Sequence, residues 1–210
     1  MSAALTPRRL AGDRNHRDRE EVEMSTTEMS AMNGVDVEAL TQTISAVQDD
    51  PKLAQFSFRA RNRWLGGGHS RTTIQSFWGA GQEDASRSEP FVIEGDEPPV
   101  LLGANHAPNA VEAVLHAIAS CLAVGVAYNA AALGIEVRSL EFDLDGELDL
   151  HGFLGLDPDV RPGYQNVRVT YRIDTDASDE NIAELLAHVQ RTSPVLDIVR
   201  NPVHVSLARA

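Results

Sequence analysis

The stretch from Ala113 to Ile135 contains no Asp, Glu, Lys or Arg, and it constrains the fold more than any other segment. It is long enough to cross a bilayer. However, it consists largely of alanine and includes His116, Ser120 and Asn129. A helix that is apolar all round is also typical of the buried core of a soluble protein. We therefore predict a buried central helix here, and no membrane contact.

The residues after this segment alternate between apolar and acidic side chains. In "VRSLEFDLDGELDLHG" the leucines and Phe142 share one face, and the acidic row Glu141 to Asp149 occupies the other. "YQNVRVTYRIDTD" repeats the alternation, which predicts two strands with one wet face. At about 3.3 Å per residue the acidic row spans ~26 Å, too far for its carboxylates to converge on a metal ion. We interpret it as a solvated face.

The first half of the chain also predicts a sheet. "LAQFSFRARNRW" and "RTTIQSFWG" read as strands on either side of Gly66-Gly67-Gly68, and "EPFVIEG" as a third. Beyond the acidic row, residues 178–191 have helical periodicity, and Ser193 with Pro194 starts a short helix. "PVHVSLA" is expected to form a last strand. Strands, a buried helix, strands and further helices together predict an α+β fold.

Composition divides the chain into three parts. Residues 1–34 are polar and mixed in charge, so we expect a disordered tail, within which Met24 is an alternative start. Residues 35–50 are expected to form a helical arm capped by Asp36, and residues 51–210 the folded domain. A pure interaction protein that docks through this arm is the weakest functional alternative.

The charge and the cysteine count limit the function. A formal net charge of -13 argues against a nucleic-acid partner. The single cysteine, Cys121, excludes a disulfide within the chain and a cysteine-based zinc site, and no secretory leader is visible. We expect a cytoplasmic protein without a cofactor. The spacing of the histidines is not typical of metal ligands, so zinc would require long-range assembly; the histidines considered are His69, His106, His116, His151, His188 and His204.

Cys121 is either a nucleophile or a packing residue. On a helix, its neighbours are apolar apart from the hydroxyl of Tyr128, and an apolar environment disfavours the thiolate. Helix geometry alone therefore favours the packing role. A reactive thiolate would need a cation from another strand or subunit, for which Arg63, His69 and Arg71 are candidates. At this point the sequence does not decide whether the chain is an enzyme.

Glu112 and His116 are four residues apart and can pair on one helix face. Glu112 precedes Cys121 by nine residues, which corresponds to about 13 Å along a helix. On a straight helix this carboxylate cannot touch the thiol. A partnership between the two would have to run through a third residue or across a dimer.

The stretch "APNAVEAVLHAIASCLAVGVAYNAAALGIEVRSLEFDLDGELDLHGFLG" resembles the OsmC/Ohr family. "RPGYQNVRVTYRIDTDAS" and "SPVLDIVRNPV" extend the likeness, which covers roughly residues 55 to 208. "GDEPPVLLGANHAPN" is similar to a subgroup outside the best-known peroxidases. The resemblance implies an α+β fold in which antiparallel sheets wrap long central helices in an intertwined homodimer, with sites at the subunit interface.

In the peroxidase members, a cysteine at the position of Cys121 attacks an organic hydroperoxide while an Arg and a Glu hold it as thiolate. The resemblance thus assigns catalytic roles to Cys121, Glu112 and Arg71. Arg63 is the second choice for the arginine, and it joins Ser193 and His116 in the expected pocket. The members' second cysteine precedes a proline, where this chain has Ser193, so the sulfenic acid would need an external thiol reductant. The alternative is a module that binds a small molecule or an acyl or sulfur group, with Cys121 structural.

Overall fold

The computed structural model describes residues 31–209, so most of the predicted tail lies outside the described residues. Residues 31–34, which the sequence placed in the tail, form β1 (Ala31–Met32) and a turn to β2 (Val35–Asp36). Asn33 and Gly34 both have positive φ, as tight hairpin turns require. The Asn33 side chain bonds the carbonyl of Ile135 and the N–H of Val137, which anchors the hairpin to the end of the central helix.

The expected helical arm is present as α2 (Val37–Asp49), and the Asp36 carboxylate caps it by accepting the Ala39 N–H. The short 3₁₀ helix η1 (Pro51–Ala54) follows because Pro51 cannot continue the α-helix. None of the side chains of α2 is buried within this chain.

The predicted sheet of the first half is confirmed. β3 (Arg61–Gly66), β4 (His69–Ile74) and β7 (Phe91–Gly95) form an antiparallel sheet in the order β3-β4-β7. β5 (Phe77–Gly79) and β6 (Gln82–Asp84) form a separate hairpin. Gly66 and Gly67 have positive φ at the β3–β4 turn, a backbone conformation that favours glycine. After β7 and the 3₁₀ helix η2 (Pro99–Leu101), the chain reaches the central helix.

The charge-free segment forms α3 (Ala110–Ala132), which Asn109 and Glu112 cap reciprocally at its start. By length and composition alone this helix could cross a membrane. Its buried side chains face α5 and α6, while Val124 and Tyr128 are about half exposed (54% and 48%). The helix is therefore a core helix on one side and uncovered on another within a single chain.

The second alternating region forms one long hairpin of β8 (Val137–Glu147) and β9 (Asn166–Thr175), with the short helix α4 (Leu150–Phe153) in the connection. Its apolar face packs against α3. On the outer face Arg172 pairs with Glu141 and Asp143, and Arg168 pairs with Asp145 and Glu147. The acidic row is thus a solvated face, as expected, and the structure adds its pairing with arginines of β9.

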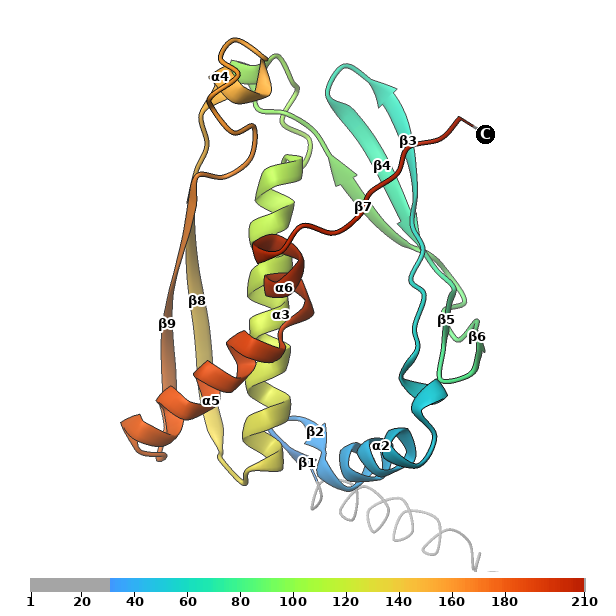
Figure 1. Ribbon diagram of the computed structural model, residues 1–210, viewed down its shortest axis with the longest axis vertical. Coiled ribbons are helices and arrows are strands. Elements are labelled where there is room, and N and C mark those ends of the chain that lie inside the picture. Colours follow the sequence, from blue (N-terminus) through green and yellow to red (C-terminus); the bar gives the residue numbers. More distant parts are fainter. Residues whose placement is uncertain (1–30, 210) are drawn as a thin grey trace, which may run out of the picture.

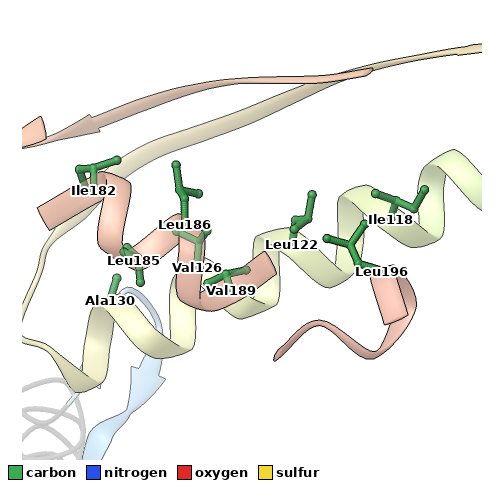
Figure 2. Packing of buried hydrophobic residues seen from close by; sticks show 9 residues of the cluster. All are labelled: Ile118, Leu122, Val126, Ala130, Ile182, Leu185, Leu186, Val189 and Leu196. Carbon is green, nitrogen blue, oxygen red and sulfur yellow. The ribbon is translucent and has the colours of Figure 1, made fainter. Parts of the chain in front are cut away.

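Two helices complete the core. α5 (Asp179–Thr192) and α6 (Pro194–Arg200) begin at Ser178 and Ser193, the caps that the sequence predicted. Figure 2 shows Val189 and Leu185 against Val126, and Leu196 beside Ile118. The hairpin lies on one side of α3 and the three-stranded sheet on the other (Figure 1). This is the mixed fold of helices and antiparallel sheets that the sequence predicted.

The expected last strand is wrong for the single chain, because residues 201–209 contain no strand. Val203, Val205 and Leu207 alternate as a strand would, but they are exposed at 52%, 77% and 99%. A strand needs a neighbour for its backbone N–H and C=O groups. Within the described residues this segment has no hydrogen-bonded strand beside it.

Candidate functional site

Cys121 lies near the middle of α3 and is partly buried. Its Sγ is 3.1 Å from the Oγ of Ser193, which is only 5% exposed. α3 carries the thiol, and the junction of α5 and α6 carries the hydroxyl. Leucine and valine side chains pack the three helices together and thereby set this contact. The structure thus brings together two of the residues that the sequence assigned to the site, 72 positions apart in the chain.

The hydroxyl of Ser193 has a second partner, because it accepts the N–H of Leu196 at 3.2 Å and so caps α6. A serine hydroxyl has one donor and two acceptor positions. With an acceptor position occupied by Leu196, the O–H remains able to donate to the sulfur. A hydrogen bond donated to a charged group stabilises that charge. Ser193 can therefore stabilise the thiolate, in addition to its structural role at the helix start.

The side chain of Glu112 takes part in the cap at the start of α3. Its carboxylate accepts the backbone N–H of Asn109, and the side chain of Asn109 accepts the N–H of Glu112. His116, which could have paired with Glu112, instead has its Nε2 3.5 Å from the Oγ of Ser120. Glu112 thus serves as a helix cap in the single chain, about two and a half turns away from the thiol.

The two arginines lie on the three-stranded sheet. Arg71 on β4 forms an ion pair with Glu94 on β7, and Arg63 lies opposite it on β3. Among residues 31–209, no hydrogen bond or ion pair joins Cys121 to Arg71, Arg63 or Glu112. Figure 1 shows why, since the sheet stands apart from the middle of α3. The expected constellation of thiol, carboxylate and guanidinium remains a prediction about an assembly.

Asp96 is a polar residue that the sequence analysis did not single out. Only 2% exposed, it accepts the backbone N–H groups of Glu97, Ala104 and His106 and contacts the His106 ring. The hydrogen bond from the His106 N–H is the main cause of its lowered pKa. It thereby organises the loop between β7 and α3. An Asp between a strand end and a Pro-Pro break was the available signal.

A pocket of about 570 Å³ lies beside the thiol-bearing helix. Apolar side chains of α3, β8, β9, α5 and α6 line it, and Arg161, Tyr164 and Arg200 add polar groups. Its lining includes Leu122 and Leu196 but neither Cys121 nor Ser193. Within residues 31–209, no group of three or more His, Cys, Asp or Glu side chains is arranged to hold a metal ion.

Comparison with known proteins places this geometry in context. The sequence pattern described as "OsmC-like protein" matches residues 103–208, half of the chain. Among solved structures, an OsmC like protein from Mycoplasma pneumoniae aligns with a TM-score of 0.53 at 14% identity, covering 70% of this chain and 89% of that one. One from Psychrobacter arcticus 273-4, provisionally described as an osmotic stress induced and detoxification response protein, aligns with a TM-score of 0.50 at 14% identity, covering 66% and 85%. No curated protein sequence matches significantly.

Proposed function

The chain belongs to the family of OsmC-like proteins, and from that premise we propose that it is a cytoplasmic thiol protein that reduces organic hydroperoxides through Cys121. The observation that carries the proposal is the contact of 3.1 Å between Cys121 Sγ and Ser193 Oγ. The contact places a hydroxyl beside a partly buried thiol, at the position where the family resemblance implies the second cysteine of the peroxidase members.

The proposed reaction needs one cysteine and an external thiol. The Cys121 thiolate attacks the outer oxygen of the hydroperoxide, the O–O bond breaks, and the alkoxide takes a proton and leaves as an alcohol. Cys121 is then a sulfenic acid. A first external thiol displaces water to give a mixed disulfide, and a second thiol releases Cys121 and a disulfide of the reductant. Ser193 cannot replace the external thiol, because a hydroxyl forms no disulfide.

The direct test is peroxide consumption by the purified full chain. With cumene hydroperoxide as substrate and dithiothreitol as reductant, we expect turnover by the wild type. Cys121→Ser should reduce the rate to that of the reductant alone, while Ser120→Ala on the exposed neighbouring position should leave it unchanged. Equal rates for wild type and Cys121→Ser would exclude the proposal.

A second experiment isolates the hydrogen bond of Ser193. Ser193→Ala should slow alkylation of Cys121 by iodoacetamide at neutral pH, because the thiolate loses a donor. This change also removes the cap of α6, at a cost of about 1 kcal/mol. Ser178→Ala is the matched control, since it removes the corresponding cap of α5 without touching the sulfur. If both variants slow alkylation equally, the contact does not activate the thiol.

Ser193→Cys tests the geometry of the site by adding a resolving thiol. Oxidation by one equivalent of peroxide should then give a disulfide between Cys121 and the new cysteine, detected by mass spectrometry as a cross-linked peptide. Turnover should become less dependent on the reductant that traps the sulfenic acid. Formation of intermolecular disulfides alone would contradict the proposed juxtaposition.

We also propose that the working unit is a homodimer, as the family resemblance implies. Large apolar side chains are exposed on the three-stranded sheet, including Trp64 at 72% and Phe91 at 60%, and on α3 at Val124. A soluble monomer rarely leaves such patches uncovered. Light scattering should give about twice the mass of one chain, and Trp64→Glu should weaken the association. A monomer at micromolar concentration would contradict the dimer.

The pocket of about 570 Å³ supports the alternative function, a module that binds a small molecule. Its apolar lining with Arg161 and Arg200 suits an amphipathic ligand such as an acyl chain with an acidic head group. Leu122→Trp should fill the pocket and abolish binding of a fluorescent fatty acid, whereas Cys121→Ser should not affect it. If Leu122→Trp still consumes peroxide rapidly but no longer binds the fatty acid, the two functions are separate.

A further inference from the structure

Two histidines on the three-stranded side of the molecule are each held by a carboxylate. His69 on β4 has its Nε2 2.8 Å from Glu94 Oε2, and His106 in the loop before α3 has its Nδ1 3.1 Å from Asp96 Oδ2. Each ring thus has one nitrogen occupied. The other two nitrogens, Nδ1 of His69 and Nε2 of His106, take part in no hydrogen bond within the described residues.

The two rings lie next to each other, with centroids 5.1 Å apart and planes tilted by 42°. Two imidazoles that share a tetrahedral zinc ion at the usual Zn–N distance of about 2.0–2.1 Å also have centroids roughly 5 Å apart. The turn before β4 reaches this loop because Gly68 has no side chain. A Cβ there would lie 3.1 Å from Asp96 Oδ1 and from Glu97. The glycine therefore allows the approach that brings His69 beside His106.

We propose that His69 and His106 bind one divalent transition-metal ion of the zinc type through these two nitrogens. Imidazole is a preferred ligand of such ions. Histidines that bind metals characteristically donate their other ring N–H to a carboxylate, which fixes the tautomer and the ring orientation. Glu94 is in this position relative to His69, and Asp96 Oδ2 lies 3.1 Å from Nδ1 of His106. The chain supplies two ligands, and water or a further ligand group completes the coordination.

The charges around the two rings suit a cation. Glu94 and Asp96 carry two negative charges, and Arg71, which contacts the other oxygen of Glu94, carries one positive charge. The net charge before binding is therefore negative. A bound ion would tie β4 to the loop that leads into the central helix.

The experiment is a calorimetric titration of the full metal-free chain with Zn²⁺ at neutral pH, in a Cys121→Ser background so that the thiol does not compete. We expect one ion per chain, and at least tenfold weaker binding in His69→Gln and in His106→Gln. His188→Gln on the exposed face of α5 is the matched control and should bind as the parent does. Glu94→Gln should weaken binding about 10–100-fold through the orientation of His69.

A spectroscopic measurement separates ligation from damage to the fold. Cu²⁺ bound to the parent should show two nitrogen ligands by electron paramagnetic resonance, and each histidine variant one, while circular dichroism stays unchanged. The proposal is overturned if the parent does not bind Zn²⁺, if only one of the two histidine variants loses affinity, or if His188→Gln loses as much as they do.

Discussion

The two halves of the molecule differ in how completely the single chain buries their apolar side chains. Every buried apolar side chain in residues 31–209 lies on α3, α5 or α6, and the β8–β9 hairpin packs partly buried apolar side chains against them. The sheet half, β3 to β7, leaves Trp64 exposed at 72% and Phe91 at 60%. The helical half therefore contains its own core. The sheet half leaves apolar side chains exposed, which is typical of a surface that binds a partner.

The junction between the halves is polar. Asp96 directly follows β7 and holds the loop that leads to α3, and it is one of two buried polar residues in the described part of the chain. The other is Ser193, at the corresponding turn between α5 and α6. Asp96 thus fixes a loop and Ser193 fixes a helix start, and each contacts a residue of a candidate site, His106 and Cys121 respectively. Apolar packing stabilises the helical half, whereas hydrogen bonds position the candidate sites.

The comparison is tested most strongly by truncating one apolar residue in each half. Leu185→Ala on α5, at a position 2% exposed, should lower the free energy of unfolding by about 2–5 kcal/mol. Ile93→Ala on β7, at a position 51% exposed, should cost about 1 kcal/mol or less in a single chain. Urea denaturation at several protein concentrations measures both effects. A large effect of Ile93→Ala that grows with concentration would identify the sheet as covered by a second copy.

The contact between α3 and α5 gives a more selective test. Replacing a glycine in a helix interior with alanine normally stabilises the helix. At Gly125, however, a Cβ would lie 2.7 Å from Cγ1 of Val189. Gly125→Ala should therefore lower the free energy of unfolding by about 1–3 kcal/mol through overpacking.

Val189→Ala supplies the control for this effect. The double variant should be more stable than the sum of the two single changes predicts, because the shortened side chain leaves room for the new methyl group. Simple additivity of the two changes, measured by the same denaturation, would show that α3 and α5 can move apart.

The polar junction should respond to pH in a defined direction. Because the folded-state pKa of Asp96 lies below its ordinary value of 3.8, its contribution is fully present above that value and is lost as pH falls through the lower folded pKa. Asp96→Asn should lower the melting temperature at pH 7, and the difference from wild type should shrink below about pH 4. A difference that stays constant down to pH 2 would mean that the carboxylate charge does not hold the loop.

The sequence predicted the elements whose stability is local. Helical periodicity and caps located α2, α5 and α6, and alternation located β8 and β9, because neighbours along the chain determine these patterns. It failed at residues 202–208, whose strand-like alternation requires a backbone partner that the single chain does not provide. The alternation of apolar residues shows that a segment can form a strand, but whether it does depends on a neighbouring strand to bond with.

The candidate sites show the same division. The family resemblance suggested that Cys121 and Ser193 share a pocket, and the structure places their side chains in contact. The pairing of His69 with His106 had no sequence signal, because the two residues lie on a strand and a distant loop. The sequence analysis assigned Glu112 to the site, whereas the single chain uses it as a helix cap. Residue spacing predicts roles that depend on neighbours along the chain, whereas contacts between distant segments become visible only in the structure.

The smallest effect is expected on the outer face of the β8–β9 hairpin. Arg172 pairs with Glu141 and Asp143, but all three side chains are 64% exposed. Water and salt screen exposed ion pairs, so Arg172→Gln should change the melting temperature by less than about 2 °C. Thermal denaturation at low and at high salt measures this. A larger drop in melting temperature that disappears in high salt would show that the arginines offset repulsion within the acidic row. The stability of the helical half would then depend on these charges as well as on its apolar core.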